Sequence, residues 1–185
     1  MIPKLEMDSA SLYKLAKAND LGNIFYGVFS SDNIELPKTF PSACIVNTDD
    51  SKSIGQHWIC LVFPTRNSVE YFDSYGLSYF CFPHFYTLIR NRFDAENIKF
   101  SEHSLQSRNS SSCGCHCIFF LNKRIVDNYS FEHIVNNIYR KDKCFNDCMV
   151  VGFCNDLKKK NNKLDIVIPN NLNNQECKCR KYFIY

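Results

Sequence analysis

The sequence predicts an α+β fold in which a central, mostly antiparallel sheet packs against helices. Residues 43–73 contain runs rich in β-branched and aromatic side chains, the pattern of buried strands. Beyond residue 113 the apolar residues instead recur at helical spacing. A sheet and helices drawn from different parts of one chain are typical of the α+β class.

Three strands are expected in the centre of the sheet, at residues 43–48, 57–63 and 69–73. Residues 64–68 resemble a turn between the second and third strands, so these two should be antiparallel neighbours. A further short strand is expected at residues 98–100.

The first helix is expected at residues 9–18, with Ser9 as its cap and Leu12 and Leu15 on its buried face. The stretch 113–121 is apolar on all sides and predicts a buried helix that begins at Cys113. Helical spacing also occurs at 84–93 after Pro83, at Phe131, Ile134, Val135 and Ile138, and at Met149, Val150, Phe153 and Leu157.

The composition indicates one intracellular domain. The chain has 185 residues, 45% of them hydrophobic, and we expect a core at 1–160 with a basic C-terminal extension at 161–185. The eleven cysteines would indicate a disulfide scaffold in a secreted chain, but the first residues lack the apolar run of a signal peptide. No run approaches the ~20 apolar residues of a membrane span. We therefore expect a monomer with free thiols in a reducing compartment and no membrane partner.

Four residues supply the side chains that a thiol protease needs. His57 can ionise a cysteine and act as base, and Asp73 can fix the tautomer and the plane of its ring. The Gln106 amide and the backbone N–H of Cys113 can donate to the oxyanion that forms on the substrate carbonyl. Cys113, at the start of a helix, would have its sulfur at the positive end of the helix dipole.

The combination is much more specific than its members. A lone histidine in a strand is usually a packed or surface residue, Asp73 could belong only to a turn, and an isolated Cys-Gly pair means little. Cys115 also competes as nucleophile, but the spacing from Gln106 and the glycine at 114 both favour Cys113. Here the candidate base His57 and its acidic partner Asp73 adjoin successive predicted strands, and the candidate nucleophile Cys113 begins a helix after a polar loop. This arrangement favours a catalytic site over a chance combination.

The order His, acidic residue, Gln and Cys, with Trp58 after the histidine and Gly114 after the cysteine, resembles the adenain family of adenovirus cysteine proteases. The same order occurs in proteases specific for SUMO and related ubiquitin-like proteins. Segments that favour the adenain family are Asp20-Leu21-Gly22, Phe25-Tyr26-Gly27, Phe40-Pro41, the run from Ala43 to Thr48, Gln56-His57-Trp58, and Asn109 to Gly114. The likeness runs from about residue 12 to about residue 120.

Carried over by position, the resemblance makes Cys113 the nucleophile, His57 the base, Asp73 its partner and Gln106 the oxyanion donor. It implies a viral endopeptidase that cleaves virion precursor proteins during maturation, at sites with Gly or another small residue before the cut. Its expected location is the host nucleus and the virion. Trp58 and Gly114 become candidate substrate-binding residues.

Two other functions remain open. One is the processing of the Gly-Gly tails of ubiquitin-like proteins. These tails need a narrow substrate tunnel at the active site, as do cleavage sites with a small residue before the cut. The other is an inactive binding module, which the complete set of catalytic side chains disfavours.

The chain departs from the adenain pattern in two places. Adenain usually has a glutamate where this chain has Asp73, the choice of the ubiquitin-like-protein proteases. Adenain is activated by a viral peptide disulfide-bonded to a cysteine about ten residues before the glutamine, where this chain has 94–97 without a cysteine. The chemistry itself requires no cofactor, and any activating peptide is expected to bind without that disulfide.

Basic residues near the C-terminus provide a candidate surface for viral DNA, which adenain binds non-specifically as a cofactor. The candidates are Lys158, Lys159, Lys160 and Lys163, and a solvated helix end explains them equally well. Cys144 and Cys148, with the later Cys177 and Cys179, allow a zinc site geometrically. We expect no metal, and interpret most of these cysteines as small packing residues.

Overall fold

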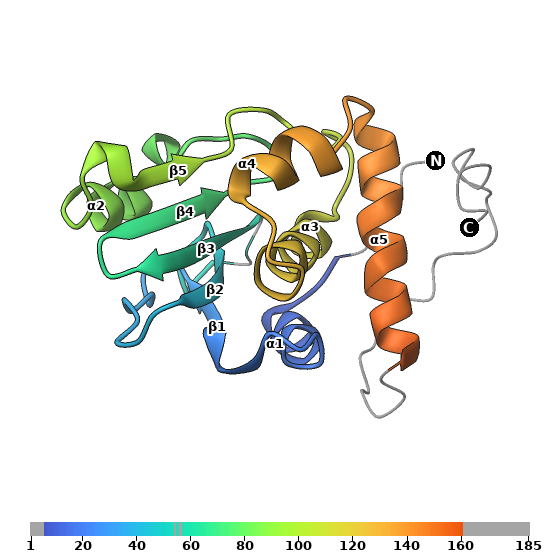
Figure 1. The fold of residues 1–185 in the computed structure, drawn as a ribbon, viewed down its shortest axis with the longest axis horizontal. Coiled ribbons are helices and arrows are strands. Elements are labelled where there is room, and N and C mark those ends of the chain that lie inside the picture. The colour runs from blue at the N-terminus through green and yellow to red at the C-terminus, as the bar shows by residue number, and fades with distance from the viewer. Residues whose placement is uncertain (1–5, 54, 56, 161–185) are drawn as a thin grey trace.

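The computed structural model describes residues 6–53, 55 and 57–160. Its five-stranded sheet has the order β1-β2-β3-β4-β5 (Figure 1). The central strands β2, β3 and β4 are antiparallel, and the outer strands β1 and β5 each run parallel to their neighbour. The predicted α+β class and antiparallel centre are therefore confirmed. The strands are β1 (Phe25–Ser30), β2 (Ser42–Asn47), β3 (Trp58–Thr65), β4 (Ser68–Phe72) and β5 (Ile98–Phe100).

Helices flank the sheet on both faces. The helices α3 and α4 each continue into a π-helical turn, Asn122–Val126 and Ile134–Ile138. The α-helices are α1 (Ser9–Lys17), α2 (Pro83–Arg90), α3 (Cys113–Leu121), α4 (Phe131–His133) and α5 (Lys143–Lys160). Short 3₁₀ turns lie at Gly22–Ile24, Tyr79–Cys81 and Ala95–Asn97.

The two faces of the sheet bury separate hydrophobic cores, because alternate residues of a strand point to opposite faces. Ile45, Cys60 and Phe72 pack against α1, α3, α4 and α5, whereas Cys44 and Tyr71 pack toward α2. In Figure 1, α3 lies between the sheet and α5. The strands read as continuous apolar runs for this reason.

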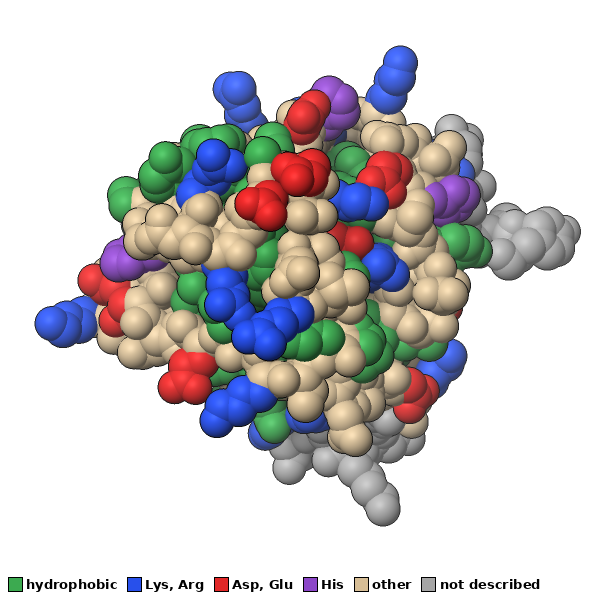
Figure 2. Space-filling model, turned by 60° about the vertical axis from the view of Figure 1, so that its left-hand side comes forward, with side chains coloured by type: hydrophobic (Ala, Val, Ile, Leu, Met, Phe, Trp, Pro, Cys, Tyr) green, Lys and Arg blue, Asp and Glu red, His purple; other side chains and the backbone are tan. Residues whose placement is uncertain are grey.

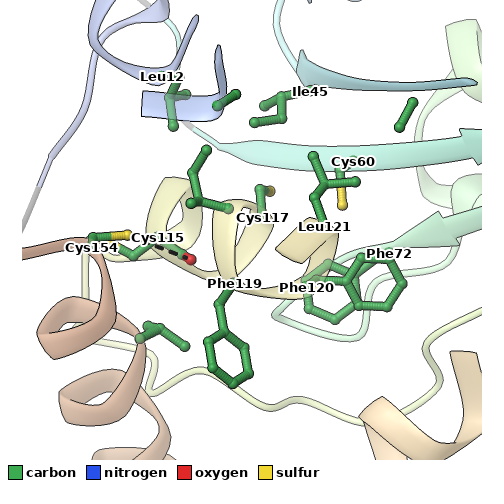
Figure 3. Close-up of a cluster of buried hydrophobic side chains, with 14 of the residues drawn as sticks. Leu12, Ile45, Cys60, Phe72, Cys115, Cys117, Phe119, Phe120, Leu121 and Cys154 are labelled. Carbon is green, nitrogen blue, oxygen red and sulfur yellow. Dashed lines mark hydrogen bonds between the residues drawn. The ribbon is translucent and has the colours of Figure 1, made fainter. Parts of the chain in front are cut away.

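Helix α3 is the centre of the larger core. All nine of its residues are buried, as expected for a helix with no polar face. Figure 3 shows its side chains between α1, the sheet and α5, with Phe120 stacked on Phe72 at a ring-centroid distance of 4.2 Å. Burying each such ring stabilises the fold by roughly 2–3 kcal/mol. The start of α3, and with it Cys113, is thus held by core packing.

Some local predictions were wrong. Asp8 caps α1, since its side chain accepts a hydrogen bond from the Ser11 N–H at 2.7 Å, whereas the predicted cap Ser9 is the first helical residue. The expected turn at 64–68 is shorter, because β3 continues through Pro64 to Thr65. Strand β1 was not predicted, and α2 ends at Arg90 instead of residue 93. None of the helices in the described ranges is long and apolar enough to cross a membrane.

Candidate active site

The topology of β3 and β4 brings His57 and Asp73 together. His57 precedes β3 and Asp73 follows β4, and in an antiparallel pair the start of one strand lies beside the end of the other. Cys60 pairs with Phe72 in this ladder. The His57 Nε2 atom lies 2.9 Å from Asp73 Oδ1, and both residues are buried.

Asp73 is fixed by several hydrogen bonds. Its Oδ1 also accepts from the Tyr75 backbone N–H at 2.7 Å. Its own backbone N–H donates to Ser101 Oγ, and Ser101 Oγ donates to the Asp73 carbonyl. Because the carboxylate cannot rotate freely, it imposes one plane on the His57 ring.

The electrostatics of His57 favour a charged ring. Burial by itself lowers the pKa of the imidazole, but interactions with Asp73 and then with Cys113 outweigh burial and raise the pKa to about 9. The second ring nitrogen, Nδ1, is buried and makes no hydrogen bond within the described residues. It is therefore the nitrogen that can exchange a proton with the Cys113 sulfur.

Cys113 is the first residue of α3 and is 7% exposed. It lines a cleft of about 750 Å³. The unpaired N–H groups at a helix start carry partial positive charge, and this stabilises an anionic sulfur there.

Gln106 is fully buried, and all of its amide hydrogens are engaged. Its Oε1 accepts from Ser74 Oγ at 2.6 Å, which sets the orientation of the amide. Its Nε2 donates to the Tyr75 hydroxyl at 3.2 Å and to the Ser110 carbonyl at 3.0 Å. Any substrate oxygen that accepts from Gln106 must therefore replace one of these acceptors.

Backbone hydrogen bonds hold Gln106 beside the loop that follows β4. The Leu105 and Gln106 N–H groups both donate to the Ser74 carbonyl, at 2.8 and 2.9 Å. Gly76 has a φ of +71°, and an added Cβ would lie 2.5 Å from the His103 backbone. Only glycine allows the two loops to approach this closely.

The cleft that contains Cys113 runs between the start of α1, the end of β1 and the β2–β3 loop. Trp58 and Tyr75 line it beside Cys113. The Trp58 indole N–H donates to the Met7 carbonyl at 2.9 Å, which joins the segment before α1 to the cleft wall. Gly114 lies on the core side instead, where an added Cβ would be 3.0 Å from Leu12 Cδ2.

Comparison with known proteins assigns the chain to a family. A family model described as adenovirus endoprotease matches residues 25–176. The chain belongs to the adenovirus endoprotease family. It is accordingly a cysteine peptidase, and its resemblance to adenain is confirmed.

The other comparisons contribute less. A solved structure described as that of a de-sumoylating protease matches with a TM-score of 0.39 and 14% identity, over 84% of this chain and 76% of that chain. A search of curated sequences returned no match.

This adenovirus-type endoprotease contains a second buried His–Asp pair, His116 of α3 with Asp147 of α5, which the sequence analysis did not predict. Asp147 of α5 accepts from His116 Nε2 at 3.0 Å, from Ser112 Oγ at 2.9 Å and from the Ser107 N–H at 3.2 Å. Burial lowers the pKa of His116, so its ring is neutral, and its Nδ1 can accept from the Tyr139 hydroxyl at 3.2 Å. The network ties the polar loop 107–112 to α3 and α5.

The structure also places the remaining candidates. Cys115 is fully buried, and burial raises the pKa of its thiol well above the ordinary value, which favours Cys113 as nucleophile. Lys158, Lys159 and Lys160 end α5, and Lys159 pairs with Asp156 at 3.4 Å.

Some candidates lie outside the described residues, among them Lys163, Cys177 and Cys179. Cys144 and Cys148 are partly buried on α5. Within the described ranges, no group of three His, Cys, Asp or Glu side chains could hold a metal ion.

Proposed function

We propose that this cysteine peptidase is a viral maturation endopeptidase that cleaves virion precursor proteins. Cys113 is its nucleophile, His57 its base, Asp73 the partner of the base and Gln106 an oxyanion donor. Membership of the adenovirus endoprotease family carries the proposal. The position of Cys113 in a cleft of about 750 Å³, its interaction with His57, and the pairing of His57 with Asp73 support it.

The proposed reaction has two steps. The Cys113 thiolate attacks the scissile carbonyl carbon, a C–S bond forms, and the π electrons move to the carbonyl oxygen. When this intermediate collapses, the C–N bond breaks and the leaving amine takes a proton from the His57 imidazolium. Water, deprotonated by His57, then attacks the thioester, and the Cys113 sulfur leaves.

The cleft walls support a preference for a small residue before the cut. Trp58 and Tyr75 line the cleft beside Cys113, and Trp58 is held by its hydrogen bond to the Met7 carbonyl. Two large rings in the lining of the cleft that contains Cys113 would limit the room for a side chain at the scissile residue. Glycine needs the least room.

Purified enzyme tests this function directly. Virion precursor proteins should be cut after Gly or another small residue by the wild-type chain and not by Cys113→Ala. Ubiquitin-like precursors ending in Gly-Gly provide the competing substrate class. Turnover of those precursors alone would overturn the maturation role while leaving the cysteine-peptidase chemistry intact.

We also propose that duplex DNA is a non-specific cofactor that binds the basic end of α5. Three consecutive lysines, Lys158 to Lys160, support this, and Lys163 follows them in the sequence. On the face seen in Figure 2, by contrast, cationic side chains are intermixed with acidic ones. Binding should weaken steeply with salt and should be reduced by neutralising the lysines. Salt-insensitive binding, or none, would exclude this cofactor.

An activating viral peptide, bound without a disulfide, is the second proposed cofactor, and the host nucleus and the virion are the proposed locations. Adding viral peptides to the reduced enzyme and measuring turnover tests for an activator. Equal activity with and without every viral peptide would exclude one.

A further inference from the structure

Tyr75 contacts the catalytic groups from several sides. Its ring lies against that of His57 at a centroid distance of 4.8 Å, and its backbone N–H donates to Asp73 Oδ1. Its hydroxyl accepts from Gln106 Nε2 at 3.2 Å and donates to the Ser110 carbonyl at 2.9 Å. Tyr75 also lines the cleft, and its hydroxyl contacts the buried Gln106.

The hydrogen bonds of Gln106 restrict how an oxyanion can be bound. One of its two N–H groups donates to the Ser110 carbonyl and the other to the Tyr75 hydroxyl. The Ser110 carbonyl accepts from both side chains, so it remains satisfied by Gln106 if the Tyr75 hydrogen turns away. An oxygen arriving beside the Tyr75 hydroxyl can thus receive a hydrogen bond from that hydroxyl. It can also receive one from Gln106 by replacing the Tyr75 oxygen as acceptor of the second amide N–H.

We propose that the Tyr75 hydroxyl is an additional catalytic oxyanion donor, acting together with the Gln106 amide. Rotation about the Tyr75 C–O bond turns the hydroxyl hydrogen from the Ser110 carbonyl toward the substrate oxygen, so the hydrogen bond changes acceptor and the O–H bond stays intact. Rotating a hydroxyl group in this way needs little energy. The inference rests on the cysteine-peptidase chemistry proposed above. It does not depend on which protein is the substrate.

The chemical step defines when this donor acts. Thiolate attack forms the C–S bond and moves the carbonyl π electrons onto oxygen, so the negative charge appears beside Tyr75 and Gln106. Collapse of the intermediate restores the carbonyl and expels the amine, and the charge disappears. A donor in place beforehand stabilises the intermediate more than the neutral carbonyl, which raises kcat without tightening ground-state binding.

The surroundings of Tyr75 keep its hydroxyl protonated. Burial, followed by the negative charges of Cys113, Asp147 and Asp73, raises the pKa of the phenol. The hydroxyl is therefore a donor throughout the working pH range. Contact with the His57 ring and the backbone bond to Asp73 fix its position relative to the nucleophile.

Tyr75→Phe tests the proposal, because it removes the hydroxyl and preserves the ring contact with His57. We expect kcat to fall about 10²-fold with KM little changed, as when other enzymes lose one oxyanion donor. Tyr71→Phe is the matched control: it removes a hydroxyl from the opposite face of the sheet, and its kcat should match that of wild type.

An unchanged or increased kcat for Tyr75→Phe would contradict the proposal. If the hydroxyl merely blocked Gln106, its removal would free an amide N–H, and kcat would stay the same or rise. Either outcome, or a change confined to KM, overturns the proposal. A thermal unfolding midpoint equal to that of wild type would show that Tyr75→Phe remains folded.

A peptide aldehyde gives a second measurement that needs no turnover. The Cys113 thiolate adds to the aldehyde carbon and the oxygen accepts the proton held by His57, which gives a hemithioacetal with its oxygen in the oxyanion position. The Tyr75→Phe variant should bind this inhibitor about 10²-fold more weakly, whereas binding of the matching peptide alcohol should not change. Equal losses for both compounds, or no loss, would contradict the proposal. The assay stays decisive even if virion precursors are not cleaved.

Discussion

Replacing Asp73 by asparagine should remove much of the charge stabilisation of His57 while preserving the shape of the site. Asp73 is fully buried, and its Oδ1 lies 2.9 Å from His57 Nε2. The His57 pKa of about 9, against 6.5 for an ordinary imidazole, corresponds to roughly 3 kcal/mol in favour of the charged ring. Asparagine keeps an acceptor there but lacks the charge, while the burial that lowers the pKa remains.

The same shift predicts how stability depends on pH. The folded-state pKa of His57 is raised, so its contribution to the free energy of unfolding is complete below about 6.5 and is lost as the pH rises through about 9. Wild type should therefore lose roughly 3 kcal/mol from this group between those values, and Asp73→Asn should lose much less.

Urea unfolding between pH 6 and 10 measures this difference. Glu132→Gln is the control, because it removes an exposed carboxylate that pairs with Lys99, far from His57 in the sequence. Comparing each variant with wild type cancels the titration of other groups. Superimposable pH profiles for wild type and Asp73→Asn would refute the origin that we assign to the His57 pKa. Asp73→Asn should also retain more turnover than His57→Ala, because a misoriented base still accepts protons.

Further predictions concern the proposed nucleophile, the proposed oxyanion donor and the buried network around Asp147. Cys113→Ala should abolish cleavage of a fluorogenic peptide with little change in thermal stability, whereas Cys115→Ala should leave turnover substantially intact, and the reverse pattern would move the nucleophile. Gln106→Ala should lower kcat roughly 10²-fold, and an effect on KM alone would exclude an oxyanion role. Asp147→Ala should cost about 3 kcal/mol in urea unfolding, because its buried donors lose their acceptor, and an unchanged midpoint would contradict this.

The pairing of His57 with Asp73 could be anticipated from the sequence because it depends on two neighbouring strands. A short joint between apolar runs predicts an antiparallel pair, and residues flanking such a pair meet at one end of the sheet. Strand β1 could not be recognised in the same way. It pairs in parallel with β2 across a long connection, and no local signal records that contact.

The inner hydrogen bonds of the site are equally non-local. Gln106 could be selected by type and spacing, but its bonds to Ser74 and Tyr75 depend on how two loops dock. His116 and Asp147 lie 31 positions apart on different helices. A histidine in an otherwise apolar helix was the available signal for this pair, but nothing in the sequence marks its partner.

The most direct test of the central claim is active-site labelling of the reduced protein, followed by peptide mass mapping. A peptide vinyl sulfone with glycine at the scissile position should modify Cys113, with one label per chain, and should not modify His57→Ala at a comparable rate. Labelling at Cys115, or at the exposed Cys81 with equal rates in both proteins, would contradict the assignment of Cys113 and His57 as the catalytic pair.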